Sequence, residues 1–167
     1  AIVTGTFVML YTGLVLSTSP SIPFWDTPML PVLFLVYGLI GGIDLVFISV
    51  AVLGETRAVD IRLLEVVQIS LFVLCGIFIW SYLAVKSSSG FGSRQAVRMI
   101  TKGKLALMFW GIVVVIGLVI PLSVLLYAYL GGGIPLLVMG IIGLLVLIGC
   151  LFFRNVVLKA GVYSPLI

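Results

Sequence analysis

Five long apolar segments, separated by short polar stretches, divide the chain. None of them alternates polar and apolar residues, as a membrane-spanning strand would. At about 1.5 Å per residue, a helix of 25 residues reaches about 38 Å, more than the bilayer's apolar core of about 30 Å. In lipid, only helices and closed barrels satisfy the backbone groups. The pattern therefore predicts an all-α, polytopic bundle of transmembrane helices over residues 1–16, 29–53, 61–85, 105–130 and 134–153.

Helix-breaking and polar residues lie between these segments. They form four joints and a tail, at residues 17–28, 54–60, 86–104, 131–133 and 154–167. The first joint has three prolines and cannot be helical throughout, and its Phe24 and Trp25 suit the level of the lipid headgroups. The third joint is predicted to be the one long loop, and Pro121 is expected to kink the fourth helix. We expect a single transmembrane domain over residues 1–167.

The first residues open directly in apolar sequence. The sequence begins with Ala1 rather than methionine, and no basic or polar segment comes before the first apolar residues. A signal peptide would need a charged start and a small-residue cleavage site. We therefore expect Ala1 to lie inside a helix of a longer subunit, whose N-terminal helices precede it.

The composition is typical of a membrane protein and excludes several classes of protein and several kinds of catalytic or metal site. Hydrophobic residues make up 63% of the chain and charged residues 8%, whereas soluble chains carry about a quarter charged residues. Soluble enzymes, DNA-binding domains and secreted disulfide scaffolds are thus excluded. The chain has no histidine, which excludes a haem held by two of its own histidines and any Ser–His pair. Cys75 and Cys150 cannot supply the four ligands of an iron–sulfur cluster, so they are interpreted as small buried residues and any redox metal belongs to a partner.

Basic residues mark one side of the predicted bundle. The net charge is +4, and seven lysines and arginines lie on the side of joints 17–28 and 86–104 and of the tail. The other side has Arg57 and Arg62. By the positive-inside rule the first side, with the C-terminus, is cytoplasmic. No basic face interleaved with aromatic residues is present for a nucleic acid to follow.

Asp44 is the most informative residue, because it lies inside the second apolar segment. Nine residues separate it from the outer end of that helix, a depth of about 14 Å. An acid at such depth costs about 2.5–3.5 kcal/mol on insertion scales and usually faces a partner or a water-filled cavity. Asp44 is therefore a candidate for proton transfer or for a hydrogen bond to a quinone. A purely structural bond to a neighbouring helix is the alternative.

Arg62, Glu65 and Gln68 follow one another at three-residue spacing at the start of the third helix. This spacing places them on one helical face near the outer interface. With Asp44 they could line a polar pocket in which Glu65 exchanges protons with water. The alternative is an Arg–Glu pair that solvates the end of the helix.

Small residues and a phenol complete the set of candidates. Gly38 and Gly42 form a GxxxG spacing that is typical of close helix packing, although such glycines could also admit a flat ring or an isoprenoid tail. Tyr11 lies inside the first apolar segment, where it could hydrogen-bond a quinone or simply a neighbouring helix.

Four stretches follow one another along the chain: YTGLVLS, IPFWDTPMLPVLFLVYGLIGG, FWGIVVVIGLVIPL and LIGCLFFRNVVLKAGVYSP. In this order they resemble the NrfD/PsrC family, the membrane subunits of polysulfide-reductase-type complexes. The resemblance covers essentially the whole chain and implies the last five helices of a haem-free subunit with eight or more helices and a quinone pocket. Of the family's quinone-site residues it carries over only Tyr11 in the YTG motif and the polar positions near the outer side. Asp44 departs from it, because many relatives are expected to have a small or apolar residue there.

The sequence thus predicts a membrane subunit that exchanges electrons and protons with the quinone pool. Asp44 and Glu65 are the candidates for proton transfer, and Tyr11, Arg62 and Gln68 are the candidates for the quinone pocket. The resemblance implies an iron–sulfur subunit and molybdopterin or multihaem cytochrome c subunits as partners, in a prokaryotic cytoplasmic membrane.

Two other functions stay open at this stage. One is a secondary transporter or ion-translocating subunit, in which helices broken at Pro121 and at residues 131–133 surround Asp44. The other is a structural anchor that holds redox subunits on the membrane.

Overall fold

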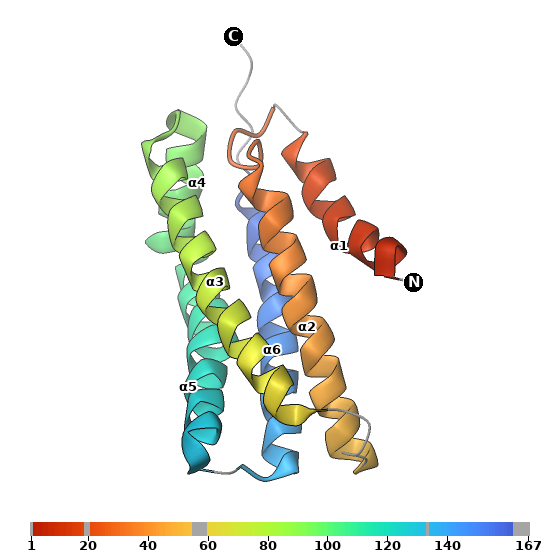
Figure 1. Cartoon of the computed structure of the whole chain (residues 1–167). Helices are drawn as coiled ribbons and strands as arrows, with labels where there is room; N and C mark the ends of the chain where they lie inside the picture. Colours follow the sequence, from red (N-terminus) through yellow and green to blue (C-terminus); the bar gives the residue numbers. More distant parts are fainter. Residues whose placement is uncertain (1, 19–20, 55–59, 133, 162–167) are drawn as a thin grey trace.

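The computed structural model describes residues 2–18, 21–54, 60–132 and 134–161. Within these ranges every regular element is a helix, which confirms the all-α polytopic bundle (Figure 1). Four helices in this part of the chain are long and apolar enough to cross a membrane: Met29–Leu53 (α2), Ile61–Ser88 (α3), Leu107–Gly131 and Leu136–Lys159 (α6). The protein is therefore a multi-pass membrane protein.

The first predicted segment forms a shorter helix than the others. Helix α1, Ile2–Ser17, has 16 residues and so rises only about 24 Å. Gly13 lets it approach α2 closely, since a Cβ on Gly13 would lie 2.5 Å from the Cα of Pro31. Figure 1 shows α1 leaning away from α2 toward its N-terminal end. The structure thus gives four helices of membrane length and a shorter apolar fifth.

Glycine contacts hold α6 in the middle of the bundle, against α2 and the helix that begins at Leu107. The closest approach joins Gly117 and Gly149, where a Cβ on Gly149 would lie 2.6 Å from the Cα of Gly117. The two glycines of the GxxxG spacing, Gly38 and Gly42, were both predicted to pack closely against another helix, and only one of them does so. Gly38 lies against Met9 of α1, whereas a Cβ on Gly42 would meet nothing within 4 Å. Close helix packing is therefore correct for Gly38, and the described residues provide no such contact at Gly42.

The predicted fourth helix is continuous but changes its hydrogen-bonding pattern. It is π-helical over Leu107–Val119 (η1), α-helical over Ile120–Tyr127 (α5) and π-helical again over Ala128–Gly132 (η2). The change from η1 to α5 falls at Pro121. Proline lacks the backbone N–H that either pattern of helical hydrogen bonds would use. Gly131 adopts φ +102°, a backbone conformation that favours glycine, near the end of the helix.

The prediction of a long loop over residues 86–104 is wrong. Helix α3 continues to Ser88, and a further helix, Phe91–Thr101 (α4), follows after two residues. Three of its apolar side chains, Ala96, Val97 and Ile100, recur at helical spacing and are buried, whereas its arginines and Phe91 are exposed. Amphipathic helices of this kind contain as many polar residues as a loop, so only the spacing distinguishes the two.

Lys86 was predicted in that loop but lies within α3 and is buried. Its ammonium group donates hydrogen bonds to the carbonyl oxygens of Pro23, at 2.6 Å, and Asp26, at 2.8 Å. A buried cation is stable only where such acceptors replace water. Lys86 therefore fixes the proline-rich joint against α3.

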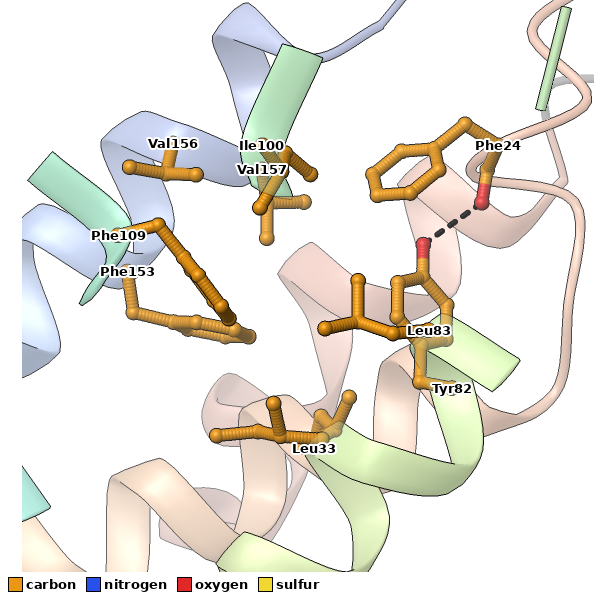
Figure 2. Close-up of a pocket in the computed structure, with 10 residues that line it drawn as sticks. Phe24, Leu33, Tyr82, Leu83, Ile100, Phe109, Phe153, Val156 and Val157 are labelled. Atoms are coloured by element: carbon orange, nitrogen blue, oxygen red, sulfur yellow. Dashed lines mark hydrogen bonds between the residues drawn. The ribbon is translucent and has the colours of Figure 1, made fainter. Parts of the chain in front are cut away.

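The aromatic residues of the same joint also point inward. Phe24, predicted at headgroup level, is only 1% exposed, and its carbonyl accepts a 2.7 Å hydrogen bond from the hydroxyl of Tyr82. Figure 2 shows this bond beside a small apolar cavity that α2, α3, α4, η1 and α6 line together. On the other side, the indole N–H of Trp25 donates to the carbonyl of Val157 at 2.9 Å, near the end of α6, where carbonyls lack helical partners.

The segments that share a side in the topology prediction also share an end of the bundle. Joint 21–28, α4 and the end of α6 lie at the upper end in Figure 1, and the end of α2 and the start of α3 lie at the other. We call the first the basic end, from Lys86, Arg94, Arg98, Lys102, Lys104, Arg154 and Lys159, and the second the opposite end. Helix α6 runs to Lys159, so the predicted tail begins later than residue 154. Ala1, Arg57, Gly133 and residues 162–167 lie outside the described residues.

Candidate functional site

Asp44 lies on the buried face of α2 and is 1% exposed. Gly143 of α6 leaves room for it, because a Cβ on Gly143 would lie 3.0 Å from the backbone oxygen of Asp44. Helix α6 therefore covers the backbone at Asp44, while α3 supplies the partner of its side chain. The acid faces the interior of the bundle, as an intramembrane carboxyl group should.

Gln68 of α3 is that partner. Its amide nitrogen donates to both carboxyl oxygens of Asp44, at 3.1 and 3.2 Å. The side chain is 0% exposed, and its amide oxygen has no hydrogen-bond partner among the described residues. A buried acceptor without a donor costs about 1–3 kcal/mol. The pair therefore has an unused acceptor next to an acid.

Burial decreases along α3 from Gln68 toward the opposite end. Gln68 is fully buried, Glu65 is 9% exposed and Arg62 is exposed. The guanidinium of Arg62 lies 5.9 Å from the ring centre of Tyr129 in η2. Because residues three apart share a helical face, the three side chains form a polar row from the surface to Asp44. We call Arg62, Glu65, Gln68 and Asp44 the polar row.

Tyr11, the remaining predicted site residue, does not join this row. Its side chain is 59% exposed on α1. Met9 and Gly13 face α2, and Tyr11, about 200° around the helix from each, faces away from it. The structure thus brings together four of the five predicted residues and leaves Tyr11 on a separate face.

A buried tyrosine that the sequence analysis passed over lies near the row. Tyr37 precedes Asp44 by seven residues, or two helical turns, on the same face of α2. Its ring stacks on that of Phe153, with centroids 4.1 Å apart, and its carbonyl accepts a 3.9 Å contact from the thiol of Cys150. Its hydroxyl is buried without a hydrogen-bond partner in the described residues, close to Cys75. The only signal in the sequence that could have pointed to Tyr37 is a tyrosine inside an apolar segment. The same signal made Tyr11 a candidate.

The two cysteines are buried and free, as the sequence analysis expected. Among the described residues, no group of three or more histidine, cysteine, aspartate or glutamate side chains gathers in a way that could hold a metal ion.

Comparison with known proteins assigns the family. The sequence profile described as "Polysulphide reductase, NrfD" matches residues 1–165. The chain belongs to the NrfD family. A curated relative, the polysulfide reductase subunit designated C of Wolinella succinogenes, is 33% identical over an alignment of 121 residues, and the match covers 66% of this chain and 36% of that protein. No solved structure matches the chain at a significant level.

The family assignment confirms the resemblance drawn from the four sequence stretches. The chain spans little more than a third of the curated NrfD relative, 36% of its length.

Proposed function

We propose that this chain is part of the quinone-reactive membrane subunit of a redox complex. The reaction is the exchange of two electrons and two protons with a quinone, and the electrons pass between the quinone and metal centres in partner subunits. The curated relative is named as one lettered subunit of polysulfide reductase, which supports assembly with other subunits. Iron–sulfur and molybdopterin or multihaem cytochrome subunits are the proposed partners, in a prokaryotic cytoplasmic membrane with the C-terminus inside.

The polar row is the observation on which this proposal depends. Glu65 is 9% exposed and Asp44 1% exposed, so their carboxyl groups differ in burial, and Gln68 donates hydrogen bonds to Asp44. An acid near the surface can exchange protons with water, and a deeper acid can pass a proton to or from a quinone oxygen. In this proposal Arg62 and Gln68 orient the carboxyl groups or the quinone. Tyr11 would contact a quinone only from the separate face of α1.

Exchange of Asp44 for asparagine tests the proposal in the intact complex. Asp44→Asn keeps the shape of the side chain but removes its proton transfer, so quinol turnover should fall about a hundredfold. Asp60→Asn is the matched control at the same end of the bundle, since Asp60 is exposed and only caps α3 through the N–H of Leu63. Both variants should assemble with their partners.

The three functions give different outcomes in the same preparation. Normal quinol turnover by Asp44→Asn contradicts the role in proton transfer. Solute or ion flux in liposomes without redox partners supports the transporter instead. Redox partners that co-purify without any response to quinone-site inhibitors support the structural anchor.

A further inference from the structure

An apolar groove runs between α3 and η1 in the half of the bundle nearer the basic end. Two adjoining hollows form it and share the walls Trp80, Leu83 and Trp110. Its deep end lies at Gly76 and Leu118. From Gly76 to Ser87 at its mouth α3 rises about 16 Å, close to half of the bilayer's apolar core. The groove thus has the length of one lipid leaflet.

The walls of the groove are exposed in the described part of the chain. Trp80 is 74% exposed and Trp110 44% exposed on its two walls. A Cβ on Gly76 would meet nothing within 4 Å, so the floor at this position is free. Tryptophan side chains of this kind lie where the membrane core meets the headgroup layer. The walls therefore fit a flexible hydrocarbon chain that enters from the leaflet at the basic end.

Side chains of α3 and α4 form the mouth of the groove. Ser87 of α3 and Val97 and Thr101 of α4 line it. On α4, Arg94 is three residues from Val97, and Arg98 is three residues from Thr101, so each arginine lies within one helical turn of the mouth. Arg98 also lines a neighbouring hollow of α4. Both arginines are exposed.

The position of Arg94 is fixed by the end of α3. Its guanidinium donates to the carbonyl of Ser89 at 2.8 Å and to that of Ser88 at 3.4 Å. Two of its five N–H groups are then used, and the others remain for an anion. A guanidinium binds phosphate oxygens through paired hydrogen bonds, which a neutral headgroup cannot match.

We propose that this groove binds an anionic phospholipid, with one acyl chain between α3 and η1 and the phosphate held by Arg94 and Arg98. Basic pockets between transmembrane helices recognise anionic lipid headgroups through this combination of charge and apolar depth. The site is distinct from the polar row, which lies on other residues of α3 nearer the opposite end. The proposed phospholipid site should prefer anionic headgroups, whereas lipids that surround a membrane protein nonspecifically show no such preference.

Native mass spectrometry of the intact purified complex tests the headgroup, with phosphatidylglycerol and phosphatidylcholine as the two probes. One phosphatidylglycerol should bind more than tenfold tighter than phosphatidylcholine. Arg98→Gln leaves the bonds between Arg94 and α3 in place and should weaken the binding of phosphatidylglycerol about fivefold. The double variant Arg94→Gln with Arg98→Gln should bind the two lipids equally. Lys159→Gln removes one exposed charge at the same end and should change nothing. Equal binding of both lipids, or equal loss in the Lys159 variant, overturns the proposal.

A second measurement tests the groove itself. Gly76→Leu fills the floor and should lower the occupancy by phosphatidylglycerol, whereas Gly111→Leu adds the same volume outside the groove walls and should not. A photocrosslinking residue in place of Ala84, which lines the mouth, should form a lipid adduct. An adduct with a protein segment, from this protein or from a partner, shows that protein covers the groove and overturns the proposal.

Discussion

Two side chains on neighbouring helices, Asp44 and Gln68, share hydrogen bonds at a depth where water does not replace a lost partner. The carboxyl group accepts both bonds from one amide nitrogen, and the amide oxygen of Gln68 is left without a donor among the described residues. A buried polar atom without a partner is costly. The unused acceptor is consistent with a site that accommodates a further donor, such as a proton carrier or a hydroxyl group.

Removal of this amide should destabilise the protein. Gln68→Leu leaves the buried carboxyl group of Asp44 without its donor, so stability should fall by about 1–3 kcal/mol. The thermal unfolding midpoint in detergent measures this change. Gln95→Leu, the same exchange at an exposed position of α4, is the control and should leave the midpoint unchanged. Equal midpoints for both variants would show that the hydrogen bonds to Asp44 contribute nothing to stability.

At the scale of the elements, glycine contacts set how closely the helices approach. Gly117 of η1 and Gly149 of α6 bring two backbones into direct contact, and Gly13 does the same for α1 on α2. Without a hydrophobic force between helices in lipid, such van der Waals contacts are a main source of helix association. At the basic end the joint 21–28 adds hydrogen bonds, since Lys86 and Trp25 connect it to α3 and α6.

The glycines of two helices should therefore respond differently to the same exchange. Gly149→Ala forces η1 and α6 apart and should cost about 1–3 kcal/mol by overpacking. Gly42→Ala meets nothing within 4 Å in the described residues and should be neutral or slightly stabilising, because alanine favours the helix. Thermal unfolding of both variants decides between them. A larger loss for Gly42→Ala would instead show that a segment outside the described residues packs against it.

At the scale of the whole molecule, charge divides the bundle into a basic end and an opposite end. Seven lysines and arginines mark the basic end, and Arg62 is the one described basic residue at the other. The polar row opens toward the opposite end, while the lipid groove opens toward the basic end. The two proposed sites therefore face different sides of the membrane.

The positive-inside rule predicts which side is which, and labelling can check it. With Cys75 and Cys150 replaced by alanine, Asp60→Cys should react with a membrane-impermeant maleimide in intact spheroplasts. Ser88→Cys, exposed at the basic end, should react only after permeabilisation. The reverse pattern would place the basic end outside the cell.

Sequence alone determined the class of the molecule, because apolar length and the positions of the charges are local properties. It therefore predicted the helices, the side shared by the basic segments and the family, and it selected Asp44 as an acid in an apolar run. It could not distinguish amphipathic α4 from a loop, nor the buried Lys86 from a free surface charge, since both depend on what lies alongside. Only the tertiary structure paired Asp44 with Gln68 and turned Tyr11 away, because the partner of a buried polar group lies on another helix, many residues distant in the chain.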